Sequence, residues 1–107
     1  MPGYHKDAEL LREIDGHQGQ VLNLAFKTDR IDGYDRLTLF SSGSNGSIVA
    51  YRPQPDTHDP SLWMPVSRIR IPELKNVPIN SIQVSPSQSK MLLCCRDGVL
   101  RMIDYQL

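Results

Sequence analysis

The residues of this chain that could most readily bind a metal ion or act in catalysis are three histidines and two cysteines. His5, His17 and His58 lie far apart in the sequence, whereas Cys94 and Cys95 are adjacent. Neither arrangement has the spacing of a zinc site, in which two or more residues separate the paired ligands. We therefore expect no metal ion and no cofactor.

A second group of residues could suggest catalysis. Ser87-Gln88-Ser89-Lys90 matches the serine-x-x-lysine pattern of some acyl-transferring enzymes, but that pattern needs a helix and partner motifs, and here it falls in a short loop. Asp29, Asp32 and Asp35 lack the spacing of a calcium-binding loop. No pair of titratable residues has a convincing catalytic spacing, so we expect no catalytic residues and no enzyme activity.

The cysteines also indicate the compartment. Neighbouring residues of a strand point to opposite faces, so Cys94 and Cys95 cannot pair with each other in a regular strand. Two free thiols, one of them directed inward, are typical of a reducing compartment. The chain has no apolar run of about 20 residues and no signal peptide at Met1 to Asp7. We expect a cytoplasmic protein without membrane insertion.

The overall charge argues against nucleic acid as a partner. The 107 residues include 12 basic and 12 acidic side chains, so no net charge attracts a polyanion. A basic strip could be formed by Arg68, Arg70, Lys75 and Arg101, but charges that protect an exposed edge strand explain them more simply. The length suffices for one small domain with a modest core.

The elements that would position these residues occur twice along the chain. Each copy has three short apolar runs with alternating residues, which predict antiparallel strands, and a tight polar turn before the last run. Val21 in the first copy corresponds to Ile79 in the second, and Gly46 corresponds to Gly98. The expected strands are 21–26, 37–42 and 47–51 in the first copy, and 79–84, 91–95 and 99–103 in the second.

Further elements lie around these copies. We expect a polar loop at 27–36, an outer strand at 10–14, and another strand at 66–71 with one charged face. A long surface loop is predicted between the copies, at 52–65, because its prolines remove backbone donors. Residues 1–9 are polar and predict a flexible N-terminal segment.

The repeated pattern resembles the WD-repeat propellers, whose blades are four-stranded antiparallel sheets. Gly16-His17, the run from Val21, the two tight turns and the ending Ile103-Asp104 carry this resemblance. It implies an all-β fold, a partial WD-repeat propeller of about two blades over 10–107. Blade 1 is expected at about 20–71 with its insertion at 52–65, and blade 2, which is incomplete, at about 78–107.

The resemblance also implies structural residues. In that family a histidine, a strand hydroxyl, a turn aspartate and a tryptophan share hydrogen bonds that lock each blade. The second copy lacks the glycine-histidine pair, so we expect its lock to be nearly absent. The lock residues that the resemblance implies are His17, Ser42 (or the neighbouring Ser41), Asn45, Tyr51, Asp97 and Asp104.

For function, the resemblance implies a non-catalytic scaffold that binds other proteins through its inter-strand loops. Trp63 either anchors its loop to the blade or contacts a partner protein, since large aromatic residues dominate interface energetics. Residues 69–80 and 100–104 are similar to one blade of a propeller protein of the ciliary transition zone and basal body, which implies a role in cilium assembly at the cilium base. The alternative is a WD-repeat scaffold of another pathway, such as ubiquitin-ligase substrate capture or vesicle and autophagy machinery.

Two blades cannot form a closed propeller, which needs about four. Unpaired strand edges and blade faces would remain exposed. We therefore expect the chain to be a piece of a longer protein or to associate with other copies.

Overall fold

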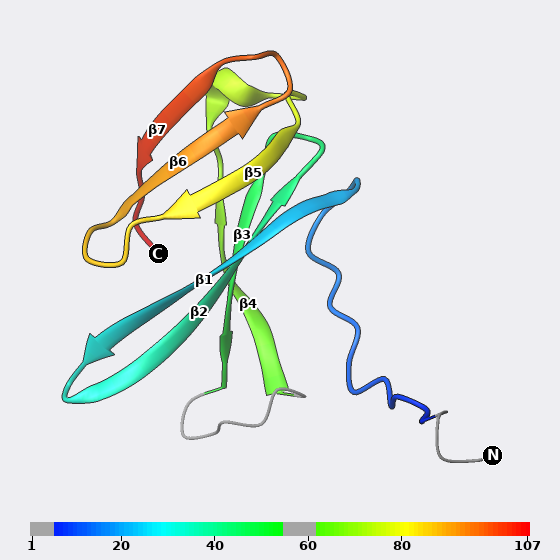
Figure 1. Ribbon diagram of the computed structural model, residues 1–107, viewed down its shortest axis with the longest axis vertical. Helices are drawn as coiled ribbons and strands as arrows, with labels where there is room; N and C mark the ends of the chain where they lie inside the picture. Colours follow the sequence, from blue (N-terminus) through cyan, green and yellow to red (C-terminus); the bar gives the residue numbers. More distant parts are fainter. Residues whose placement is uncertain (1–5, 55–61) are drawn as a thin grey trace.

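Two antiparallel sheets make up the protein in a computed structural model that describes residues 6–54 and 62–107 (Figure 1). The larger sheet has the order β1-β2-β3-β4 and the smaller one β5-β6-β7. The all-β prediction is therefore confirmed. The strands are β1 (Val21–Ile31), β2 (Tyr34–Gly43), β3 (Ile48–Pro53), β4 (Trp63–Ile69), β5 (Ile79–Val84), β6 (Lys90–Cys95) and β7 (Leu100–Asp104).

The two sheets repeat the same strand register. In the first, Val21 pairs with Gly43 and an irregularity follows before Asn23; in the second, Ile79 pairs with Cys95 and an irregularity follows before Ser81. Val21 and Ile79 are equivalent in the repeat with an offset of 79 − 21 = 58 residues. Gly43 and Cys95 have the offset of Gly46 and Gly98, 98 − 46 = 52 residues. The internal repeat is therefore present in the backbone pairing.

The tight turns repeat as well. Gly46 and Gly98 have φ angles of 81° and 84°, a left-handed conformation that glycine adopts without steric cost. The amide of Ser44 donates to the carbonyl of Gln20 at 2.9 Å, and the corresponding amide of Arg96 donates to Pro78 at 2.9 Å. Each turn thus ties the hairpin of the second and third strands of its sheet to the residue before the first strand.

The core lies between the two sheets. Phe40, Ile48 and Ala50 from the larger sheet are fully buried in one cluster with side chains of the smaller sheet. Leu74, in a short 3₁₀ helix over Pro72–Leu74, is also fully buried there. The buried members from the smaller sheet are Ile79, Ile82, Met91, Leu93 and Cys95.

Each sheet has a second apolar face, which is not covered by the other sheet. Since side chains alternate between faces, the residues beside the core-facing ones point away from it. We define the open face of the β1–β4 sheet as Val21, Leu24, Phe26, Leu37 and Leu39, and the open face of the β5–β7 sheet as Leu92, Cys94, Leu100 and Met102.

The prediction of a polar loop at 27–36 is wrong. β1 and β2 continue to a two-residue turn at Asp32 and Gly33, whose φ angles are 53° and 80°. Positive φ at both positions gives the primed turn that matches the twist of a hairpin, and Asp-Gly is a favoured sequence for it. The polar residues at 32–36 are therefore the solvated end of a long hairpin, whereas Lys27 is buried.

The predicted strand at 10–14 is also wrong, because no strand precedes β1 in the described residues. A strand requires a neighbouring strand for its ladder of backbone hydrogen bonds, and none of the described strands pairs with this segment. Of the predicted loop at 52–65, Arg52 and Pro53 belong to β3 and Trp63 to Pro65 belong to β4, while 55–61 lie outside the described residues.

β4 confirms the prediction of an edge strand with one charged face. It pairs only with β3, and this edge position tolerates Pro65, which has no amide proton to donate. Arg68 and Arg70 are exposed, whereas Ile69 packs against the core. The predicted pair of thiols is confirmed too, since Cys94 is exposed, Cys95 is buried and both are free.

Candidate functional site

His17 is the centre of a polar network on the β1–β4 sheet. Its Nε2 lies 2.6 Å from Oγ of Ser41, and that hydroxyl lies 2.8 Å from the Tyr51 hydroxyl. Its Nδ1 lies 2.9 Å from Oγ of Ser47, which donates to Oδ1 of Asn45 at 2.6 Å. The network joins the segment before β1 to β2, to β3 and to the turn between them.

Of the two candidate hydroxyls, Ser41 and Ser42, the one in this network belongs to Ser41. Adjacent strand residues face opposite ways, and Ser42 points toward the other sheet. There its Oγ donates to the carbonyl of Ile79 at 2.8 Å. Ser42 therefore helps to hold the two sheets together.

A histidine beside a serine could also suggest nucleophilic catalysis. Ser41, however, is only 1% exposed and shares its hydroxyl with Tyr51. The second ring nitrogen of His17 faces the Ser47 hydroxyl, and no carboxylate of the described residues orients it. Burial lowers the pKa of His17, hydrogen bonding to Ser41 opposes this, and the charge of Arg68 adds to it. The arrangement favours a neutral, structural imidazole.

The lock residues predicted in the second repeat do not meet a histidine. Asp97 accepts from the amide of Val99 at 3.1 Å and from two nitrogens of Arg101 at 3.0 and 2.9 Å. Hydrogen bonding to Arg101 is the main cause that lowers the pKa of Asp97. Asp104 forms an ion pair with Lys90 at 3.5 Å. Both aspartates stabilise their own hairpins locally.

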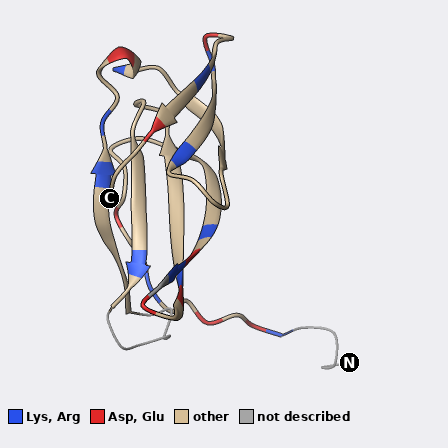
Figure 2. Ribbon diagram, turned by 90° about the vertical axis from the view of Figure 1, so that its left-hand side faces the viewer, with Lys and Arg blue, Asp and Glu red and all other residues tan. Residues whose placement is uncertain are grey.

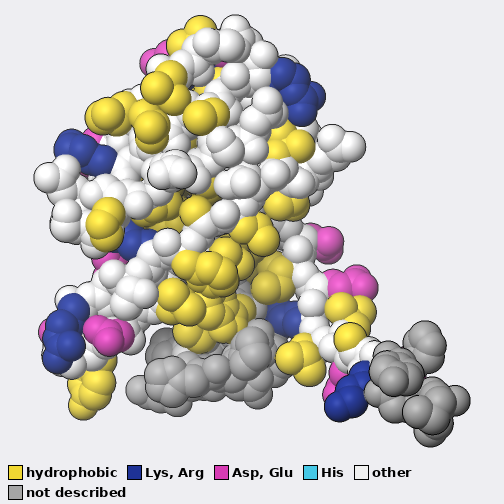
Figure 3. Space-filling view, viewed as in Figure 1, with side chains coloured by type: hydrophobic (Ala, Val, Ile, Leu, Met, Phe, Trp, Pro, Cys, Tyr) yellow, Lys and Arg dark blue, Asp and Glu magenta, His cyan; other side chains and the backbone are white. Residues whose placement is uncertain are grey.

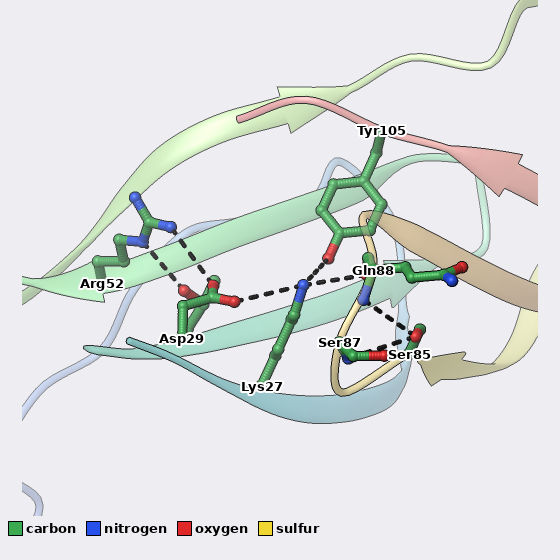
Figure 4. Close-up of polar contacts among 8 residues, drawn as sticks. Lys27, Asp29, Arg52, Ser85, Ser87, Gln88 and Tyr105 are labelled. Atoms are coloured by element: carbon green, nitrogen blue, oxygen red, sulfur yellow. Dashed lines mark hydrogen bonds and ion pairs between the residues drawn. The ribbon is translucent and has the colours of Figure 1, made fainter. Parts of the chain in front are cut away.

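A cluster of charged and polar residues bridges the sheets at one end of their interface (Figure 4). Nζ of Lys27 donates to the carbonyl of Gln88 at 3.0 Å and to the Tyr105 hydroxyl at 3.3 Å, and it pairs with Asp29 at 3.3 Å. Burial lowers the pKa of Lys27, but Tyr105 and Asp29 outweigh it, so the pKa is raised.

An open cleft of about 570 Å³ lies beside this cluster, lined in part by Lys27, Asp29 and Arg52. Lys27 is 8% exposed, and Arg52 both donates to Thr38 at 3.0 Å and lies 4.0 Å from Asp29. The cations are thus already partnered by protein groups. We interpret the cluster as a clamp between the sheets.

The strongest candidate for binding is the open face of the β1–β4 sheet. Leu24 and Phe26 are 57% and 62% exposed. The ring of Trp63, across the sheet on β4, meets Phe26 edge-on with 6.4 Å between ring centroids. Figure 3 shows hydrophobic side chains gathered beside β1, with a second group over β6 and β7.

The period-two spacing in the expected strand at 21–26 predicts Leu22, Leu24 and Phe26 on one face, but it does not indicate that this face stays open. Trp63 was singled out as either an anchor or a partner contact, and the structure gives it a neighbour, Phe26, that is itself exposed. Trp63 and Phe26 together form a half-exposed aromatic pair.

Other kinds of site receive no support from the described parts of the chain. Within 6–54 and 62–107 no three His, Cys, Asp or Glu side chains converge as metal ligands. The same residues form no helix with the length and hydrophobicity to cross a bilayer. Lys and Arg positions and Asp and Glu positions both occur along the ribbon of the described residues (Figure 2).

No known family profile matches the chain, and no solved structure was found to be similar to it. Its function must therefore be argued from its own residues.

Proposed function

We propose that this protein is a non-catalytic scaffold of the WD-repeat type that binds other proteins. Two sheets with the same register, the same turn and the same tether to the preceding residue support a repeat protein. The His17–Ser41–Tyr51 network supports the blade lock that the family resemblance implies. Its lock tryptophan is replaced here by Tyr51.

The observation that carries the proposal is the open apolar face around Phe26 and Trp63. Contiguous exposed apolar groups on a soluble protein mark interaction surfaces, and aromatic residues supply much of the binding free energy there. No catalytic constellation competes with this surface in the described residues, since the one histidine–serine pair is buried within a structural network.

The partners we propose are those of a jouberin-like protein at the cilium base. Jouberin is the propeller protein of the transition zone and basal body that residues 69–80 and 100–104 resemble. A tagged chain expressed in ciliated cells should concentrate at the cilium base and co-localise with a transition-zone marker. A signal at vesicles, autophagosomes or ubiquitin-ligase complexes would instead favour a WD-repeat scaffold of another pathway.

Trp63→Ala tests the surface itself. We expect partner binding at the cilium base to weaken by about tenfold or more, since aromatic anchors dominate interfaces. Loss of the edge-on contact with Phe26 should lower the free energy of unfolding by only about 1 kcal/mol. Recruitment by fluorescence microscopy and thermal unfolding of the purified variant measure the two effects.

The matched control is Tyr34→Ala. Tyr34 is 76% exposed at the end of the β1–β2 hairpin, away from the aromatic pair. Recruitment should remain at the wild-type level. If Trp63→Ala unfolds the protein, or if both variants are recruited equally, Trp63 is an anchor for its own sheet and not a partner contact.

A further inference from the structure

The internal repeat relates the open face of each sheet to the core-facing side of the other sheet. Phe40, Ser42 and Ile48 of the β1–β4 sheet are buried against the smaller sheet. Their repeat equivalents in the β5–β7 sheet are Leu92, Cys94 and Leu100, which lie on its open face. The open face of the smaller sheet is thus equivalent to a face that packs on a β-sheet.

The open face of the β1–β4 sheet is likewise equivalent to the core-facing side of the β5–β7 sheet. Ile79 and Ile82 are buried against the β1–β4 sheet. Their equivalents, Val21 and Leu24, lie on the open face and are 54% and 57% exposed. The chain therefore carries both halves of the contact that it makes internally, each without its counterpart.

The two turn glycines show the same missing contact. A Cβ on Gly46 would clash with the carbonyl oxygen of Leu74, so the segment before β5 packs directly on this turn. Gly98 has the same conformation, but a Cβ there would meet nothing within 4 Å. The repeat equivalent of Leu74 is Gly16, which precedes β1.

A strand is missing in the same place. β3 pairs with β4, whereas β7 has no fourth strand beside it in the described chain. Arg68 and Ile69 of β4 correspond to Leu10 and Leu11, which precede β1, belong to no strand and are 72% and 59% exposed. The free edge of β7 could therefore pair with the exposed apolar segment at Leu10 and Leu11.

We propose that copies of this chain associate head to tail. The open face of the β5–β7 sheet of the first copy packs on the open face of the β1–β4 sheet of the second copy. Leu10 and Leu11 of the second copy then pair with β7 of the first copy and supply the fourth strand of its sheet. The inference rests on the proposed function of these faces as protein-binding surfaces. A second copy is the occupant because one chain carries both complementary halves, which gives a heterologous contact.

The repeat also predicts one intermolecular pair of residues. Inside the chain, Oγ of Ser42 donates to the carbonyl of Ile79 at 2.8 Å. The equivalents are Cys94 in one copy and Val21 in the next. Val21→Cys should therefore place two thiols, one of them native, within reach of a disulfide between copies.

The experiment is mild oxidation of purified Val21→Cys, followed by non-reducing electrophoresis. We expect linked dimers and larger multimers, because each chain carries one thiol of each kind. Tyr34→Cys, with its thiol at an exposed position off both open faces, should give far less product. The double variant Val21→Cys with Cys94→Ser should give none of the ladder.

A second measurement does not depend on cysteine chemistry. The wild-type chain should show a mass above that of a monomer by light scattering, and the mass should rise with concentration. Leu100→Asp, a change at a site that is 62% exposed in the single copy, should weaken this association by about tenfold or more while the fold is retained. A monomeric wild-type chain at every concentration, without a specific disulfide ladder, would overturn the proposal.

The outcomes separate this inference from the proposed function. A monomer whose Trp63→Ala variant still loses recruitment to the cilium base would leave the scaffold function standing and refute self-association. A self-associating chain that is absent from the cilium base would support the head-to-tail contact and contradict the ciliary role.

Discussion

The two sheets share a backbone register but hold the segment before their first strand by different chemistry. In the β1–β4 sheet, His17 reaches Ser41 and Ser47 by hydrogen bonds. The repeat equivalents of these two serines are Leu93 and Val99, and in the β5–β7 sheet the segment before β5 instead buries Leu74 in the core. The same geometry is thus stabilised once by polar contacts and once by apolar packing.

Their positions explain the difference. Leu74 and Leu93 lie between the two sheets, where an unpaired polar group would cost several kcal/mol of desolvation. His17 lies beside the open face of the β1–β4 sheet and is only half-buried, so polar groups there can be satisfied at low cost. The two repeats can therefore share one strand register while the side chains that hold the segment before the first strand are apolar where they are buried and polar where they are partly exposed.

The largest effect should come from the apolar lock, by which we mean the packing of Leu74 and Leu93 in the core. Leu93→Ala removes a fully buried side chain and leaves a cavity, so we expect the free energy of unfolding to fall by about 2–5 kcal/mol. Urea unfolding measures it. Leu37→Ala, at a site that is 38% exposed, should cost less than about 1 kcal/mol. Equal losses at the two sites would contradict a lock made by burial.

The polar lock, which is the His17–Ser41–Tyr51 network, should contribute less to the free energy of unfolding than the apolar lock. Ser41→Ala removes the hydroxyl that His17 and Tyr51 share, so we expect a loss of about 1–3 kcal/mol in the free energy of unfolding. A double-mutant cycle with Tyr51→Phe should show a coupling of at least about 0.5 kcal/mol. Strict additivity would mean that the two hydroxyls do not act together.

The smallest effect should be a pH dependence confined to the polar lock. Because the folded pKa of His17 lies below the unfolded value of 6.5, the unfolded chain binds this proton more tightly. The contribution is complete above pH 6.5, is lost as the pH falls toward the folded pKa, and then levels off. Urea unfolding between neutral and mildly acidic pH measures it.

The control for this pH dependence is His17→Gln. This variant removes the titrating group and keeps a polar side chain, so it should have a flatter stability profile than the wild type over the same pH range. An identical profile in the two proteins would assign the dependence to other groups.

The sequence predicted the fold where local signals were strong. The positions of β5, β6 and β7 follow from alternating apolar residues, and the turn at Gly98 follows from its glycine. The charged residues of 27–36 favour a loop, whereas the Asp32-Gly33 pair favours a hairpin turn, and the structure has the hairpin. Polar composition alone does not end a strand whose two faces are both solvated.

The site depended more on context. Ser41 and Ser42 are equivalent in local sequence, and only the register of β2 against its neighbours decides which one faces His17. Leu24 and Phe26 have the spacing of core residues, yet whether that face is buried depends on a sheet elsewhere. The clamp of Lys27 with Tyr105 joins residues 78 positions apart, which no local pattern could indicate.

By itself, the sequence determined the repeat, the all-β class and the tight glycine turns, because strand alternation and turn conformation are set by neighbouring residues. Only the tertiary structure decided which faces meet. The same amphipathic strand can be covered or exposed, and long-range packing between β1 and β5 chose one face of each sheet for the core and left the other open.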